Sequence, residues 1–139
     1  MEKNNSDCIF CKIVKGEMPC HKVWEDEDFL AFLDVNPVVE GHVLVIPKKH
    51  YKDIFETPLD IVRKINVVCK NIALILKEKL GINDVNILNA SGKNAQQSVF
   101  HLHYHVVPRK RKDGLDLWFH VDYKDKINLS KFAKKIRGE

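Results

Sequence analysis

The chain has 139 residues, of which 45% are hydrophobic and 30% charged, and its formal net charge is +4. This length suits one compact domain, and the composition excludes a chain that is disordered throughout. The amino terminus lacks the apolar core of a signal peptide, and the longest strictly apolar stretch, residues 72–76, is far too short to cross a bilayer. We therefore expect a single domain over residues 1–139, located in the cytoplasm and without a membrane partner.

A short helix is expected over residues 9–14, because Asp7 can cap it and Gly16 can end it. From Pro58 to Leu80, apolar residues recur at three- and four-residue spacing, which predicts one long helix, and Cys69 falls on or beside its apolar face. A small terminal helix is expected near 129–136. Apolar and alternating segments predict five strands, at residues 21–25, 29–33, 42–46, 85–90 and 99–107. These elements indicate an α+β fold with antiparallel pairing.

The last predicted strand carries three histidines, His101, His103 and His105. Side chains alternate along a strand, so the three share one face. The other face is expected to hold Phe100, Leu102, Tyr104 and Val106. A merely solvated face is more often built from Thr, Lys or Glu, whereas imidazoles exchange protons or bind metals near neutral pH. The pattern therefore favours chemistry over packing.

One metal ion does not fit all three histidines. The outer two lie about 13 Å apart at the backbone of a strand, whereas zinc holds imidazole nitrogens at about 2 Å. At least one histidine is therefore available for another role. A histidine becomes a nucleophile when one nitrogen is fixed by an acceptor and the other faces an electrophile.

Cys8 and Cys11 have the two-residue spacing of half a zinc knuckle. No strand precedes them, which disfavours a redox C-x-x-C motif. No second such pair occurs, so two histidines would have to complete a zinc site. We interpret Cys20 as incidental and Cys69 as a core residue.

The run His101-Leu102-His103-Tyr104-His105-Val106-Val107 resembles the signature of the histidine triad (HIT) family of nucleotide hydrolases and transferases. Further similarity lies at residues 8–13, 41–50 and 97–99. The resemblance covers about residues 7–110, leaving 111–139 as a C-terminal extension, and is closest to the bacterial-type, Hint-like branch. It implies a HIT-like fold, with a five-stranded antiparallel sheet, one long helix and short terminal helices. It also implies a homodimer in which two subunits extend the sheet.

The resemblance assigns His103 as the nucleophile that attacks the α-phosphorus of a purine nucleotide and forms a nucleotidyl-histidine intermediate. His105 and Ser98 would assist the leaving group, and His42 would support the triad. Nucleotide binding would fall to Asp34, Asn89, Gln97 and Val99, together with His103 and His105. Nucleoside phosphoramidates, adenylates and dinucleoside polyphosphates all present this phosphorus.

By the same resemblance, a structural zinc ion would be held by Cys8, Cys11, His50 and His101. Such a closed Cys₂His₂ set would anchor the amino terminus to the histidine strand. Gln96 stands where family members often have glycine, so we expect the backbone of the phosphate-binding loop to be affected.

Two other functions compete with this interpretation. One is a zinc hydrolase in which the triad itself holds a water-activating metal. The other is a nucleotide-binding or scaffold protein without significant turnover. The basic run Arg109 to Lys112 is more typical of a solvated turn than of a nucleic-acid site, so nucleic acid is not the expected partner. Residues 118–120 could cover the site or a subunit interface.

Overall fold

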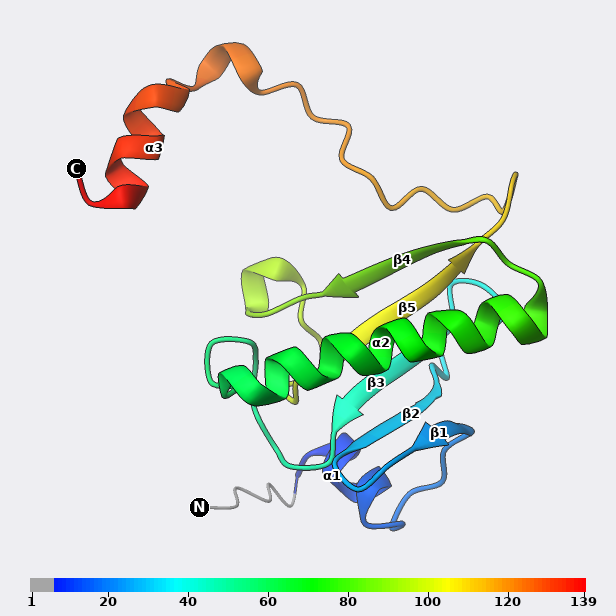
Figure 1. Cartoon of the computed structure of the whole chain (residues 1–139). Helices are drawn as coiled ribbons and strands as arrows, with labels where there is room; N and C mark the ends of the chain where they lie inside the picture. The colour runs from blue at the N-terminus through cyan, green and yellow to red at the C-terminus, as the bar shows by residue number, and fades with distance from the viewer. Residues whose placement is uncertain (1–6) are drawn as a thin grey trace.

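The computed structural model describes residues 7–139 (Figure 1). Its helices and strands, in chain order, are α1 (Ile9–Val14), β1 (Lys22–Glu25), β2 (Phe29–Leu33), β3 (Val43–Pro47), α2 (Leu59–Leu80), β4 (Asp84–Asn89), β5 (Tyr104–Arg109) and α3 (Leu129–Arg137), with short 3₁₀ turns at Lys93–Ala95 and Lys124–Lys126. The strands form one antiparallel sheet in the order β1-β2-β3-β5-β4. The predicted α+β class, with its five-stranded sheet, long helix and terminal helices, is confirmed.

The sheet divides the core into two layers, because successive side chains of a strand point to opposite faces. Val43, Val45 and Val106 pack on the side of α2, against Ile65 and Ile72. The intervening residues of β2 and β3 pack with α1 in a second cluster. Figure 1 shows α2 crossing one face, with α1 close to β1 and β2. The histidine site lies on the α1 side, since His105 pairs with Leu44 of that second cluster.

Helix α2 has the face that its periodicity predicts. Its buried residues are Ile65, Val68, Cys69, Ile72 and Leu76. It ends at Gly81, whose φ of 66° lies in the left-handed region that glycine adopts at low cost. Burial raises the pKa of the Cys69 thiol to about 12, which keeps it protonated. The expectation that Cys69 serves packing is confirmed.

The sequence predicted too early a start for the last strand. Strand β5 begins at Tyr104, not at residue 99, although Leu102, Tyr104 and Val106 are buried as expected. Residues 99–101 form bends, and the Leu102 N–H donates to the Tyr51 carbonyl (2.6 Å) outside any strand. Strict alternation does not extend into these bends, so Phe100 is 44% exposed and does not line the core.

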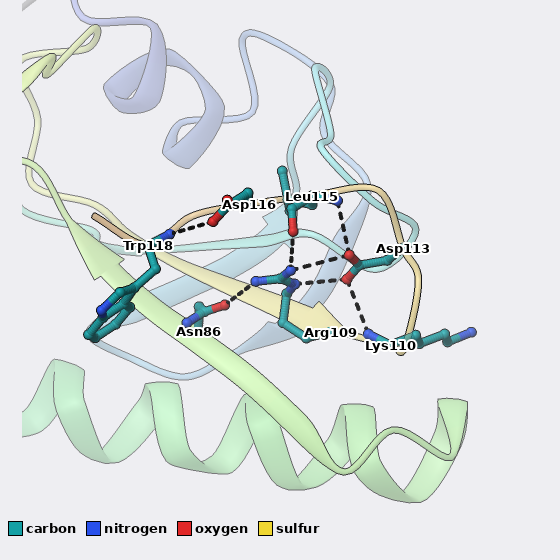
Figure 2. A network of polar contacts seen from close by, with 7 residues as sticks. All are labelled: Asn86, Arg109, Lys110, Asp113, Leu115, Asp116 and Trp118. Carbon is teal, nitrogen blue, oxygen red and sulfur yellow. Dashed lines mark hydrogen bonds and ion pairs between the residues drawn. The ribbon is translucent and has the colours of Figure 1, made fainter. Parts of the chain in front are cut away.

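The C-terminal extension begins at a polar clasp centred on Arg109 (Figure 2). The guanidinium donates to both carboxylate oxygens of Asp113, at 2.8 and 3.2 Å, to the Asn86 side-chain oxygen at 2.8 Å, and to the Leu115 carbonyl. The chain then runs away from the sheet to α3, whose residues are all exposed (Figure 1). Within residues 7–139 no helix combines the length and apolar character needed to cross a membrane.

Candidate functional site

A cavity of about 320 Å³ opens on the α1 side of the sheet. One part of its wall is apolar and includes Ile9, Ile13, Phe32 and Leu44. The polar part of its wall includes Asp34, Ser98, His103 and His105. A larger cavity of about 680 Å³ lies between the end of α2 and the loop before β3, but no histidine lines it. Of these two cavities, the smaller one combines an apolar binding surface with histidine side chains.

His103 presents an unprotonated nitrogen to this cavity. Its Nδ1 lies 2.8 Å from the His101 carbonyl oxygen. A carbonyl can only accept, so the proton of the neutral ring is on Nδ1 and the lone pair is on Nε2. Burial lowers the pKa of this imidazole, which keeps the ring neutral near pH 7. A neutral imidazole held in this tautomer is suited to nucleophilic attack.

The tautomer of His105 is set by a chain that begins at the backbone. The Val38 N–H donates to His42 Nδ1 (3.2 Å), which places the His42 proton on Nε2. That Nε2–H donates to His105 Nδ1 at 2.8 Å. The proton of neutral His105 is consequently on Nε2, where it can serve as a hydrogen-bond donor. His103 and His105 thus have opposite tautomers: His103 has its lone pair on Nε2, and His105 has its proton there.

The electrostatic environment keeps His105 neutral. Burial lowers its pKa to about 4, and the nearby His103 and His42 rings act in the same direction. The Asp34 carboxylate opposes this shift in the pKa of His105. Asp34 Oδ2 lies 3.6 Å from His42 Nε2, and Oδ1 accepts from the Asn36 N–H at 2.9 Å. This carboxylate sits in the cavity wall, where the sequence predicted a ribose contact.

The predicted phosphate-binding residues divide into two groups. Ser98 and Val99 line the cavity. The Asn89 amide donates to the His103 carbonyl (3.1 Å), and its oxygen accepts from the Ser91 hydroxyl (2.8 Å). The Gln97 amide donates to the carbonyls of Lys52 and Val99, and its oxygen accepts from a backbone N–H. The side chains of Asn89 and Gln97 therefore stabilise the backbone around the site through hydrogen bonds.

The loop before Ser98 retains a backbone suited to glycine. Gln96 has φ 68°, in the left-handed region, and it follows the turn at Lys93–Ala95. The substitution noted in the sequence therefore changes the side chain while the chain keeps the conformation that glycine adopts most easily. An L residue in this region costs roughly 1–2 kcal/mol.

Cys8, Cys11, His50 and His101 form a compact set of ligand atoms, all within 4.8 Å of one another. Cys8 Sγ and Cys11 Sγ lie 3.3 and 3.5 Å from His101 Nδ1. His50 Nδ1 lies 3.3 Å from Cys11 Sγ and 3.2 Å from His101 Nδ1. Tetrahedral zinc, with bonds of about 2.3 Å to sulfur and about 2.0 Å to nitrogen, separates its ligand atoms by about 3.3–3.8 Å. The set fits zinc in both donor type and spacing.

His101 belongs to this set and not to the cavity. Its Nε2 lies 2.8 Å from the Pro47 carbonyl and must donate to it, so the lone pair is on Nδ1, which faces the cysteines. The three histidines of the sequence run are thereby separated into one residue of the cysteine cluster and two residues of the cavity.

A second close group consists of Asp34, His42 and His105. Its two imidazole nitrogens are 2.8 Å apart, which is a hydrogen-bond distance. Two nitrogen ligands of tetrahedral zinc would be about 3.3 Å apart. The geometry of this group is therefore that of a hydrogen-bonded chain.

Sequence reasoning did not assign a site role to Phe10. Its ring lines the cavity and packs edge-on against both His101 and His103. The available signal was its place between the two cysteines of the C-x-x-C pair. The backbone groups of Val38, Pro47 and His101 were also missed, because every residue carries the same carbonyl and almost every residue the same N–H.

Comparison with known proteins gives consistent results. The HIT domain family matches residues 15–112. A HIT-like protein from Methanocaldococcus jannaschii is 44% identical over 94% of this chain and 99% of its own length. An adenosine 5'-monophosphoramidase from Saccharomyces cerevisiae is 35% identical over 93% of this chain and 80% of its own length. An adenylylsulfatase from Arabidopsis thaliana is 42% identical over 79% of this chain and 56% of its own length.

Solved structures share the fold over almost the whole chain. A HIT family protein from Bacillus anthracis superposes with a TM-score of 0.86 at 39% identity, covering 96% of each chain. A zinc-bound histidine triad family protein from Mycobacterium smegmatis gives a TM-score of 0.77 at 38% identity, covering 96% of this chain and 98% of its own.

Proposed function

The chain belongs to the HIT domain family, and we propose that it is a hydrolase or nucleotidyl transferase that cleaves at the α-phosphorus of a purine nucleotide through a nucleotidyl-His103 intermediate. The observation that carries this proposal is the hydrogen bond from His103 Nδ1 to the His101 carbonyl, because it leaves the lone pair on Nε2. Two relatives, an adenosine 5'-monophosphoramidase and an adenylylsulfatase, support an adenosine nucleotide as substrate.

In the first step, His103 Nε2 attacks phosphorus as a neutral nucleophile, which avoids repulsion from the anionic phosphate oxygens. The new N–P bond forms as the bond to the leaving group breaks, and the leaving group takes that electron pair. The imidazole becomes cationic, and the carbonyl that accepts its Nδ1–H stabilises this charge. The Nε2–H of His105 donates to phosphate, while Ser98 assists the leaving group.

In the second step, water attacks phosphorus and loses a proton to solvent, while the N–P bond breaks and returns its electron pair to Nε2. His103 is again neutral with its proton on Nδ1, and the mononucleotide leaves. Attack by another acceptor in place of water would give nucleotidyl transfer. One difficult displacement is thereby replaced by two easier ones.

The nucleoside would occupy the apolar part of the cavity, between Ile9 and Ile13 of α1 and Phe32 of β2. A flat purine base suits such a surface. Asp34 lies in the same wall and would accept a hydrogen bond from the ribose.

We also propose that Cys8, Cys11, His50 and His101 hold a structural zinc ion. All four coordination positions would be filled by protein, so the ion would stabilise the fold and leave no position for substrate.

Thiolate ligands favour a reducing compartment, and we place the activity in the cytoplasm. We further propose that the protein is a homodimer, joined through the edge strand β4.

A second candidate is a metal-hydroxide hydrolase, in which Asp34, His42 and His105 hold a catalytic ion. The closeness of these three side chains favours this candidate. The hydrogen bond between His42 and His105 argues against it, because its 2.8 Å is shorter than the separation of two nitrogen ligands on zinc. A nucleotide-binding protein without turnover is the third candidate, and it predicts binding without product.

The direct test of the proposed function is His103→Ala. We expect turnover of adenosine 5'-phosphoramidate to fall by about 10³-fold or more, because the covalent nucleophile is lost. Binding of adenosine monophosphate and the melting temperature serve as controls for folding. Near-normal turnover by a folded His103→Ala protein would exclude His103 as the nucleophile, and an inactive parent protein would favour the non-catalytic candidate.

A further inference from the structure

Phe10 occupies a position between the cysteine cluster and the proposed nucleophile. It is the second residue of α1, lies between Cys8 and Cys11, and is only 6% exposed. Its ring centroid is 5.2 Å from that of His103 and 5.8 Å from that of His101, at interplanar angles of 81° and 79°. Perpendicular aromatic contacts of this kind are favourable and directional. One ring thus contacts a member of the cysteine cluster and the nucleophile at once.

His103 needs such a contact, because few other groups fix its ring. One hydrogen bond, from Nδ1 to the His101 carbonyl, sets its tautomer but still lets the ring tilt about that bond. His105 packs against the ring at a centroid distance of 5.1 Å, and Phe10 packs at 5.2 Å. In-line attack requires Nε2 to point at phosphorus from about 3–3.5 Å, so a small tilt has a large effect on rate.

Phe10 can hold this orientation only if α1 itself is fixed. A helix of six residues is not stable alone. The Cys8 side chain caps it by accepting from the Cys11 N–H, and both sulfurs lie within 3.5 Å of His101 Nδ1. The same Phe10 ring also packs edge-on against Phe32 of β2, at a centroid distance of 5.6 Å. The cysteines therefore fix α1 to the same residue whose carbonyl sets the tautomer of His103.

We propose that Phe10 is a positioning residue that holds the His103 ring at the angle required for attack, and that the cysteine cluster acts on the nucleophile through it. This inference rests on the proposed function. It gives the cluster a role in the covalent step, beyond anchoring the amino terminus. Phe10 also lines the cavity, so its effect on the rate must be separated from any effect on nucleotide binding.

The test compares Phe10→Leu with Leu30→Ala. Leu30 is 4% exposed and belongs to the same buried cluster, but it does not line the cavity. Leu30→Ala removes more buried volume than Phe10→Leu, so it controls for general loosening of the core. For each variant, adduct formation with saturating adenosine 5'-phosphoramidate is followed in a single turnover by alkaline quench and mass spectrometry. The Kd for adenosine monophosphate and the melting temperature are measured alongside.

We expect Phe10→Leu to slow adduct formation by about 10- to 100-fold while the Kd changes by less than about threefold. Leu30→Ala should lose more thermal stability and keep a rate within about threefold of the parent. A slower rate of adduct formation in both variants would overturn the positioning role and leave the proposed function standing. Weaker nucleotide binding with an unchanged rate in Phe10→Leu would do the same. A parent protein that turns over without any adduct would overturn the proposed function, and this inference with it.

Discussion

The three histidines of one short run differ in hydrogen bonding because different neighbours accept or donate at their ring nitrogens. The Pro47 carbonyl directs the lone pair of His101 toward the cysteines, and the His101 carbonyl directs that of His103 toward the cavity. His105 Nδ1 instead accepts a hydrogen bond from the Nε2–H of His42. The sequence supplies three similar side chains, and the groups around them decide which nitrogen of each neutral ring carries the proton.

The acid limb of the pH–rate profile depends on His105 and on the proposed nucleophile, His103. Its pKa is lowered from 6.5 to about 4 by burial and by the adjacent His103 and His42 rings, with Asp34 opposing the shift. His105 therefore stays neutral as the pH falls below 6.5 and is protonated only near pH 4. Burial also lowers the pKa of His103, whose protonation would remove the attacking lone pair. We therefore expect the acid limb of kcat/KM to lie below pH 6.5.

The profile is measured with a dinucleoside polyphosphate, which has no terminal phosphate to titrate in this range. Melting curves at each pH show whether the protein remains folded. An acid limb centred at or above pH 6.5 would contradict the lowered pKa values of His103 and His105.

At the scale of elements, α1 depends on the cysteine cluster. Metal binding to such a site contributes directly to folding free energy. We expect one zinc ion per chain, and we expect its removal by a chelator to lower the free energy of unfolding by about 3 kcal/mol or more. Elemental analysis and thermal melting measure the two quantities.

A matched pair of variants tests the ligand assignment. Cys11→Ser should lose the metal, whereas Cys20→Ser should retain it, because Cys20 is not part of the cluster. Equal metal content in these two variants would show that the ligands are wrongly assigned.

The alternation of side chains predicted the faces of the strands better than their ends. Residues 42–46 and the spacing of α2 indicated which side chains form the core, because burial on one face imposes a fixed period. The predicted strand at 99–107 was wrong over residues 99–103. There the chain lies outside the sheet, and the Leu102 N–H donates to the Tyr51 carbonyl. Such backbone partners are invisible in a sequence, since they depend on which loops meet.

The candidate site shows the same division. The histidine run and the C-x-x-C pair indicated the side chains that carry chemistry. The amides of Asn89 and Gln97 were assigned to nucleotide binding, and the structure places them against backbone groups of the protein. Phe10 was not assigned a site role despite its place between the two cysteines, because an apolar residue in a short helix is normally a packing residue.

For the whole molecule, the sheet separates a packing face from a reactive face, and its edge strand β4 is open. Ile87 and Leu88 of β4 are 44% and 37% exposed. An unpaired edge with exposed apolar side chains is a template for pairing with another copy. We expect a dimer by sedimentation at micromolar concentrations, and we expect Ile87→Lys to shift it toward monomer. A monomeric parent protein, or an unchanged dimer in the variant, would place the interface elsewhere or exclude it.

The covalent His103 mechanism is tested most directly by stereochemistry at phosphorus. Two successive in-line displacements retain configuration, whereas a single attack by metal-bound hydroxide inverts it. The measurement is hydrolysis of an adenosine phosphorothioate of known configuration in isotopically labelled water. We predict net retention in the released mononucleotide. Net inversion would contradict the nucleotidyl-His103 intermediate and favour the metal-hydroxide mechanism.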